Sequence, residues 1–512
     1  MKTNKSKSSQ INIQSVALVV VLIFLIICHG GYSFSVIVLS GAVMSVLLAF
    51  ATKGVSISLS QGIFTVFSLW YFICSLRHGF ITEYAAKGAL PTVLLIFWLF
   101  ISSGNINKPK IINALMEASM WIALFSIIHC IVISINASSV QRLVFPFDYS
   151  NACGIYFAVC YFLCSGSESS FVRRIRFVFP VALILTQSVG AGVLFFAALI
   201  FTFIKQKKYI AIACIFIALV LFILVFSGRI AQSMGTFAER ILHINDGLRC
   251  LADNPLSGIG AGWWEHAGQS YRTGYYSARV IHSSITSIAV NSGIPGIVLF
   301  LAVLLPELIA IFKAKKYFLP ALILIIHSMA DFSLSFTVLG VMLVLMTSES
   351  KKKIPLNPIA VKTSLIALSL GFVLVLSSLL TSGIYQKKLE TTGGNTQHIT
   401  AFKTKFALRH SVRSAQCLAA KLYSDADLSG GNIFENYKFM PTEVILYNAM
   451  LKQDENYILD IFSRQSYNTA LRDYIIKDFP AISEKVEKIT ADAVEKASPV
   501  GKYLYKLKGE NK

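Results

Sequence analysis

The chain has 512 residues, of which 55% are hydrophobic and only 14% are charged. Because soluble globular proteins carry roughly 25% charged residues, this composition excludes an ordinary soluble enzyme. The net charge of +20 is typical of nucleic-acid-binding proteins, but the Lys and Arg residues lie mostly in short loops between apolar blocks, and no aromatic and basic nucleotide surface is visible. We therefore expect no nucleic-acid partner.

Apolar blocks of about 18 to 25 residues, long enough to cross roughly 30 Å of hydrocarbon, follow one another from residue 11 to residue 382. Two stretches, 177–204 and 317–347, exceed one ordinary span and have basic residues near their ends, so each predicts a pair of short helices. The predicted fold class is all-α, a polytopic helical membrane protein with about 11 to 13 spans. The single spans are expected near 11–28, 32–50, 58–76, 88–102, 112–135, 149–165, 209–226, 285–312 and 361–382.

The charges of the loops predict the orientation of these spans. Alternate loops are rich in Lys and Arg, and the basic N-terminus, residues 1–10, falls on the same side. The positive-inside rule assigns that side to the cytoplasm. The long first apolar run lacks a clear cleavage site and favours a retained span over a signal peptide. We expect a transmembrane domain over 11–382, with loop 227–283 and a C-terminal domain over 383–512 both outside the cytoplasm.

Loop 227–283 is the only long polar segment between predicted spans. It predicts a helix near 236–252, a Pro/Gly turn over 254–260 and a return to the membrane at 279–282. Between the turn and the return lie Trp263 and Trp264, which we expect to anchor the loop at the membrane interface.

The C-terminal segment predicts a small helical domain. Apolar residues recur at helical spacing over 441–466 and 468–497. No clean 34-residue helix-pair repeat is visible, and a degenerate repeat stays open.

Arginine and histidine side chains concentrate in loop 227–283. Guanidinium groups pair with phosphate oxygens in two-point fashion, and a histidine at a membrane boundary can act as a general base. The loop therefore suggests a lipid-phosphate substrate, with headgroup binding without turnover as the alternative. The nine Cys show no metal-ligand spacing, and we expect no metal. The residues that carry this interpretation are Arg229, Arg240, Arg249, Arg279 and His282.

An ordered set of short motifs resembles the O-antigen ligase and O-antigen polymerase superfamily. The most specific one begins at Arg240, continues through a predicted helix and ends in Pro-Leu-Ser-Gly-Ile-Gly-Ala-Gly at 255–262. The other motifs, in family order, are Phe-Asp-Tyr-Ser-Asn-Ala-Cys-Gly at 147–154, His282-Ser-Ser, Asn-Ser-Gly-Ile-Pro-Gly at 291–296, and His327-Ser-Met-Ala-Asp331. Together they cover roughly residues 145–345.

This resemblance implies a metal-independent bacterial glycosyltransferase of the cytoplasmic (inner) membrane that needs no cofactor. Such enzymes move a glycan from an undecaprenyl-diphosphate donor to an acceptor hydroxyl on the outer side. By the resemblance, His282 matches the essential histidine that deprotonates or orients the acceptor, and Arg240 matches the loop arginine. Arg279 lies close enough in sequence to His282 to neutralise diphosphate charge. His327 and Asp331 stand four residues apart, so we expect them on one face of a helix, in a supporting or structural role.

Two positions depart from the family pattern. Val189 stands where the family often has a diphosphate-binding arginine, and Ile244 stands where a tryptophan is usual. Arg249 or Arg229 is the expected replacement for the missing arginine.

Several functions remain open at this point. Within the family, the acceptor can be a lipid, a growing glycan or a protein, which correspond to a ligase, a polymerase and a protein glycosyltransferase. Outside it, a transporter or flippase, or a non-catalytic scaffold for polysaccharide export, would also be polytopic. Transporters usually carry ionisable residues at mid-membrane and internal repeats. Neither is visible here, which favours chemistry at the membrane surface.

Overall fold

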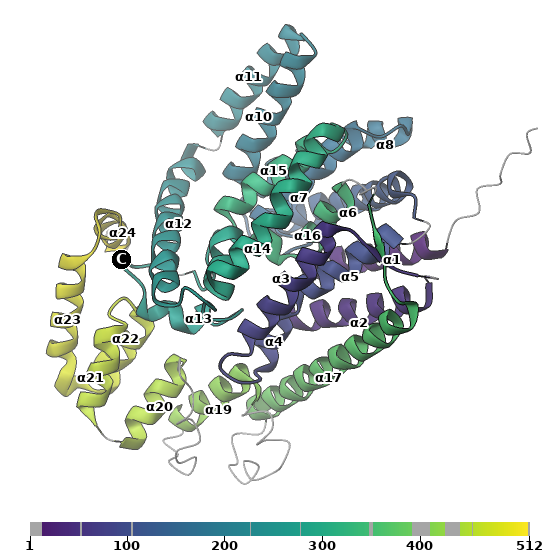
Figure 1. Cartoon of the computed structure of the whole chain (residues 1–512). Coiled ribbons are helices and arrows are strands. Elements are labelled where there is room, and N and C mark those ends of the chain that lie inside the picture. Colours follow the sequence, from purple (N-terminus) through teal and green to yellow (C-terminus); the bar gives the residue numbers. More distant parts are fainter. Residues whose placement is uncertain are drawn as a thin grey trace, which may run out of the picture.

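The computed structural model describes residues 13–51, 54–103, 106–225, 227–276, 278–347, 352–391, 410–424, 441–452 and 454–509. The basic N-terminus expected over residues 1–10 lies outside the described residues. Within them the regular secondary structure is helical apart from one two-stranded antiparallel pairing, β1 (Ser56–Ile57) with β2 (Ile354–Pro355). The predicted all-α polytopic membrane fold is confirmed (Figure 1).

The helices before the long loop follow the predicted spans closely. They are α1 (Ile13–Ile27), α2 (Phe34–Ala51), α3 (Leu59–Ser75), α4 (Thr82–Gly88), α5 (Leu90–Ser103), α6 (Lys108–Asn136), α7 (Ser150–Ser165), α8 (Ser170–Ile175), α9 (Val178–Thr186), α10 (Val189–Lys205) and α11 (Tyr209–Val225). The expected pair within 177–204 is confirmed as α9 and α10.

The loop and the second half of the membrane domain are also helical. Their helices are α12 (Ser227–Asp253), α13 (Trp264–Ala267), α14 (Ser284–Ala314), α15 (Phe318–Ala330), α16 (Thr337–Met346) and α17 (Pro358–Thr391). The pair expected within 317–347 is α15 and α16, and the loop helix expected near 236–252 is longer than predicted. Short 3-10 turns occur at η1 (His29–Gly31), η2 (Gly268–Ser270), η3 (Ser333–Ser335) and η6 (Pro480–Ile482).

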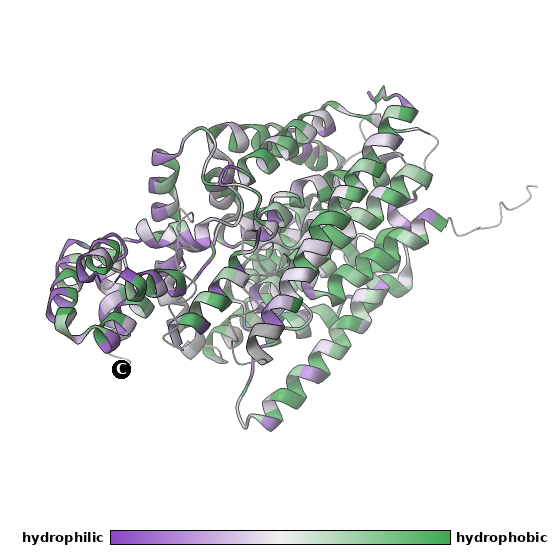
Figure 2. Cartoon of the chain, turned by 90° about the horizontal axis from the view of Figure 1, so that it is seen from below, coloured by the Kyte–Doolittle hydropathy of each residue, from purple (hydrophilic) through white to green (hydrophobic). Residues whose placement is uncertain are grey.

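Four described helical segments are long and apolar enough to cross a membrane, namely Thr82–Ser103, Lys108–Asn136, Ser284–Ala314 and Pro358–Lys387. Most of the other predicted spans fall on shorter apolar helices. Figure 2 shows that hydrophobic residues dominate the helices of this bundle, whereas hydrophilic residues are more frequent on the C-terminal helices. Helix α7 lies at the centre, since nearly all of its side chains are buried, and its first turn therefore holds functional side chains rigidly.

The described residues of the C-terminal segment form a series of short helices. They are α19 (Val412–Ser424), α20 (Thr442–Lys452), α21 (Glu455–Arg464), α22 (Thr469–Asp478), α23 (Ser483–Lys496) and α24 (Pro499–Gly509). The range 441–466, where apolar residues recur at helical spacing, contains α20 and α21, and the range 468–497 contains α22 and α23. Asp454 accepts hydrogen bonds from two backbone N–H groups and so starts a new helix at α21. Pro480 begins the turn that separates α22 from α23.

The two loop tryptophans do not anchor the chain at a membrane interface. Trp263 and Trp264 are only 2% and 6% exposed. The Trp263 ring packs 4.5 Å from the ring centroids of both Tyr84 and His78. The expectation failed because the preceding turn folds the tryptophans inward against α4, where burial of their large apolar rings stabilises the loop.

Candidate functional site

Asp331 is the centre of a buried polar cluster. Helix α15 ends one residue earlier, and Asp331 has extended backbone angles (φ −151°, ψ 164°). It therefore does not share a helical face with His327, and that expectation was wrong. Its Oδ2 atom accepts hydrogen bonds from Arg240 (3.0 Å), Tyr149 (2.9 Å) and Asn151 (3.1 Å). Asp331 is fully buried, so these donors supply the partners that a buried carboxylate requires.

The cluster joins segments that are far apart in sequence. Arg240 comes from α12, Asn151 from the first turn of α7, and Asp331 from the end of α15. Ser284, the first residue of α14, donates two hydrogen bonds to the Asp331 carbonyl, one from its backbone N–H and one from its hydroxyl. Both donor–acceptor distances are 3.0 Å. Four of the sequence motifs thus meet at Asp331.

His282 lies beside this cluster, immediately before the N-cap of α14. Its Nδ1 atom is 3.5 Å from the Tyr149 hydroxyl oxygen. Its ring stacks on His243 at 5.2 Å between centroids, and Phe332 meets it edge-on at 5.3 Å. Burial lowers the pKa of His282; Asp331 raises it, and Arg240 lowers it further. Since burial is the largest effect, the imidazole is neutral near pH 7 and can accept a proton.

Arg279 is not part of the Asp331 cluster. Its side chain is 76% exposed, and Nη1 lies 3.4 Å from Glu265 Oε1. Both residues line a small cavity of about 80 Å³ next to Phe332, together with Lys87 and Asn291. This cavity, named here the polar cavity, therefore carries two cationic side chains and one carboxylate.

The Pro/Gly turn of the loop docks on a break in α14. Gly293 has a positive φ of 71°, and Pro295 cannot donate the helical bond to the carbonyl of Asn291. Backbone N–H groups of the turn replace the missing bonds: Ile259 donates to Val290 (2.8 Å) and Gly260 donates to Asn291 (3.0 Å). In return, Ile294 donates to Pro255 (2.7 Å).

This exchange explains why the two glycine-rich motifs occur together. Non-helical backbone at membrane depth needs hydrogen-bond partners from the protein itself. A Cβ on Gly258 would stand 2.2 Å from the Val290 carbonyl oxygen, and one on Gly293 would stand 2.2 Å from that of Leu256. The close approach therefore requires glycine on both sides. It fixes the start of α14, and with it His282.

The remaining predicted site residues are spread out. Arg249 follows Arg240 by nine residues, about two and a half helical turns, which places it on the opposite face of α12, where it is exposed. Arg229 lies near the start of α12, eleven residues before Arg240. The structure does not bring Arg249 into the Asp331 cluster, and the side chain of Arg229 lies outside the part of the chain that the structure describes.

His327 belongs to a neighbouring position. It is buried, and its Nδ1 atom lies 2.8 Å from the Ser333 hydroxyl. Its ring lies 4.0 Å from the place a Cβ on Gly190 would occupy. His327 therefore faces the start of α10, where Val189 replaces the usual arginine.

Several residues of the site escaped the sequence analysis. Tyr149 and Asn151 lie inside the motif at 147–154, which was recognised without assigning a role to either side chain. His243 is one of the histidines noted in loop 227–283, but it received no role of its own, and Lys87 carried no local signal. Because Lys87 meets the loop only through the packing of α4, neither its position nor its partners follow from its neighbours in sequence.

Comparison with known proteins agrees with these motifs. Residues 176–301 match the family model described as O-antigen ligase. The matched segment contains Arg240, His282 and the turn that docks on α14. The resemblance to the O-antigen ligase and polymerase superfamily is confirmed, and with it a membrane protein of general ligase or polymerase type. No curated protein matches the chain.

Proposed function

We propose that this protein is a membrane glycosyltransferase that transfers or polymerises a glycan from an undecaprenyl-diphosphate donor onto an acceptor hydroxyl. The reaction takes place at the outer face of the bacterial cytoplasmic membrane, with the N-terminus in the cytoplasm and the domain over 383–512 outside. The observation that carries the proposal is the neutral, half-buried His282 held between the Arg240–Asp331 pair and the cationic polar cavity.

The proposed reaction uses a general base for the acceptor and cationic side chains for the leaving diphosphate. His282 accepts the proton of the acceptor hydroxyl, whose oxygen then bonds to the anomeric carbon of the donor sugar. The bond from that carbon to the diphosphate oxygen breaks, and the diphosphate leaves with the electron pair. Arg279 neutralises part of the charge that develops on the leaving diphosphate.

Arg240 has two roles in this proposal. One of its amino groups is engaged by Asp331, which holds the guanidinium beside His282. The side chain is 21% exposed, so the remainder of the planar group stays within reach of a diphosphate. Acceptor and donor sugar are left open, and ligase, polymerase and protein-directed activity share this mechanism.

The test is complementation of a deletion strain with wild type, His282→Ala and Arg240→Ala, with mature glycan and lipid-linked donor separated on gels. Both variants should reach the membrane, lose mature glycan and accumulate donor. Loss of the base in His282→Ala should lower the rate of transfer roughly 100-fold or more. Arg464→Ala, an exposed arginine of α21 paired with Asp460, is the matched control. The length pattern of the glycan made by the wild type distinguishes a ligase from a polymerase.

A second assay separates a transferase from a transporter. Purified protein in detergent, supplied with lipid-linked donor and acceptor, has no membrane to move a substrate across. New glycosidic bonds formed there, and lost in His282→Ala, support the proposal. If both variants behave as wild type in cells and no bond forms in detergent, a transporter or a scaffold is the better account.

A further inference from the structure

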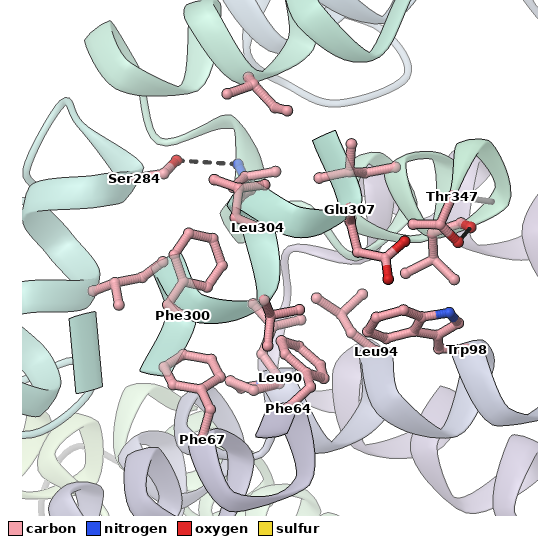
Figure 3. A pocket seen from close by; sticks show the side chains of 18 of the residues that line it. Phe64, Phe67, Leu90, Leu94, Trp98, Ser284, Phe300, Leu304, Glu307 and Thr347 are labelled. Carbon is pink, nitrogen blue, oxygen red and sulfur yellow. Dashed lines mark hydrogen bonds between the residues drawn. The ribbon is translucent and has the colours of Figure 1, made fainter. Parts of the chain in front are cut away.

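The outer part of the protein contains a cavity whose lining differs from that of the membrane domain. The space between α3, α5, α14 and α16 is apolar, as the rings of Phe64, Phe67 and Trp98 in Figure 3 show. By contrast, a cavity of about 300 Å³ with a largely polar lining lies where loop 227–283 meets α19, α20 and α22. We name this second cavity the outer cleft. It combines side chains of the loop that carries the site with side chains of the C-terminal helices.

Carboxamide and hydroxyl groups are frequent in the lining of the outer cleft. The carboxamides are Gln269, Gln416, Gln465 and Asn468. A carboxamide both donates and accepts hydrogen bonds, and so does a sugar hydroxyl. Asn468 already donates to Gln465 over 3.1 Å and to Thr442 over 3.3 Å, which holds this wall of the cleft in place. The wall therefore suits a ligand that is rich in hydroxyl groups.

The charges of the outer cleft disfavour an anionic ligand. Glu265 and Glu443 both line it, and a carboxylate repels a phosphate. Two arginines also contribute to the lining. Arg272 already donates to two backbone carbonyls of the loop, over 2.9 and 3.5 Å, and Arg279 lies beside Glu265. Because the guanidinium groups are engaged or balanced in this way, the cleft favours a neutral ligand.

Two polar side chains of the loop lack the partners that a ligand could supply. The Oε1 atom of Gln269 is buried and has no hydrogen-bond partner among the residues that the structure describes. Buried polar atoms in proteins are nearly always paired, so this acceptor in the cleft wall suits a donating hydroxyl. His266 is also buried in the wall, and burial lowers its pKa to about 4. Its neutral ring can therefore exchange hydrogen bonds with a hydroxyl group.

Tyr474 of α22 gives the outer cleft an aromatic side chain that a ligand can reach. It lines the cleft, and it is 47% exposed. The C–H face of a sugar ring packs on an aromatic ring, while the sugar hydroxyls keep their hydrogen bonds at the edges. An aromatic ring among carboxamides thus fits a glycan better than a peptide, which is bound through apolar pockets or a paired backbone.

We propose that the outer cleft binds sugar units of the glycan that the enzyme transfers, so that the C-terminal helices form part of the substrate site. This inference rests on the proposed function and adds to it a binding site for the glycan strand. Glu265 and Arg279 line both the outer cleft and the polar cavity. The polar cavity adjoins Phe332, whose ring meets His282. A strand held in the cleft therefore leads toward the proposed base, and it can belong to the acceptor or to the donor.

Two exposed alanines of the C-terminal helices provide a matched binding test. Ala470 of α22 lines the outer cleft, whereas Ala491 of α23 does not. The probe is the oligosaccharide that mild acid releases from the lipid-linked donor of the deletion strain. Its binding to the purified full-length protein in detergent is measured by calorimetry. Ala470→Trp narrows the cleft and should weaken binding roughly tenfold or more, while Ala491→Trp leaves it unchanged. Gln269→Leu should also weaken binding, with an unchanged thermal midpoint, because Oε1 has no partner to lose.

Transfer kinetics in detergent identify the source of the strand. A raised KM for the acceptor alone in Ala470→Trp assigns the strand to the acceptor, and a raised KM for the donor alone assigns it to the donor. Equal affinity of the wild type, Ala470→Trp and Gln269→Leu for the oligosaccharide would overturn the cleft proposal, whatever the activity. No binding by the wild type would also overturn it and favour a polypeptide partner. Selective loss of binding in both variants, with no transfer by the wild type, would support the glycan site and refute the proposed transferase.

Discussion

At the scale of single residues, the site keeps one histidine neutral next to charged groups. Asp331 and Arg240 act on His282 with opposite signs, and burial decides the outcome by lowering its pKa below the ordinary value of 6.5. The Arg240–Asp331 pair thus contributes little net charge while fixing Tyr149 and Asn151 by hydrogen bonds. A general base that works at neutral pH needs this combination of rigid placement and a proton-free ring.

The pH dependence of transfer follows from the directions in which burial, Asp331 and Arg240 shift the pKa of His282. In the wild type, kcat/KM should rise with pH as His282 loses its proton at a pKa below 6.5 and then level off. In Arg240→Gln a charge that lowers this pKa is lost, and Asp331, which raises it, is left unbalanced. The acid limb should therefore move to higher pH, while Arg464→Gln keeps the wild-type profile. An unmoved limb in Arg240→Gln would show that the titrating group is not His282.

At the scale of elements, the break in α14 and the Pro/Gly turn form one structural unit. Two helical hydrogen bonds are exchanged for bonds to the turn, and the Trp70 indole N–H adds a bond of 2.8 Å to the Ser292 carbonyl. The result is a fixed junction between loop 227–283 and the membrane domain. Since His282 and Arg279 lie between this turn and the start of α14, the junction positions both.

Replacing a glycine of this junction should destabilise the protein. Gly258→Ala places a Cβ 2.2 Å from a backbone oxygen at a residue whose φ is +61°, so strain and overpacking together should cost at least about 2–3 kcal/mol. Gly371→Ala, in a helix where nothing lies within 4 Å of the added Cβ, is the control and should be neutral or slightly stabilising. Thermal unfolding in detergent measures both; equal midpoints would contradict the docking described here.

At the scale of the whole molecule, the C-terminal helices pack against the loop that carries the site. In Figure 1, α24 lies beside α12. Leu504 of α24 packs with Leu242 and Tyr276, and the Tyr276 ring meets His243 edge-on at 4.2 Å. His243 in turn stacks on His282. A chain of contacts therefore leads from the last helix to the proposed base.

Disturbing this packing should reduce activity without touching the site. Leu504 is 1% exposed, and Leu504→Asp puts a charge into an apolar contact, which should release α24 and loosen the loop. We expect kcat to fall roughly tenfold or more through misplacement of His282, with faster hydrogen exchange over 264–282. Tyr503→Asp, at a neighbouring position that is 47% exposed, should change neither. If Leu504→Asp retains full kcat although exchange increases, the C-terminal helices are not needed to position the base.

Local patterns were enough to predict the membrane class, most helix positions and the motifs. The length of an apolar block and the charge of a short loop are properties of neighbouring residues, so spans such as α7 and the short pairs could be read directly. The same holds for the turn at 255–262, whose glycines meet a backbone requirement. The helix boundaries of the C-terminal segment were less predictable, because caps such as Asp454 compete with a continuous apolar pattern.

The partners of the site residues were decided only by the tertiary structure. Asp331 was expected on the helical face of His327, yet the helix ends before it and its carboxylate turns to Arg240, Tyr149 and Asn151. Lys87 reaches the polar cavity only because α4 packs under the loop. These contacts join residues separated by tens to hundreds of positions. The physical reason is that burial and charge pairing depend on which helices pack together, and no local pattern in the sequence records that.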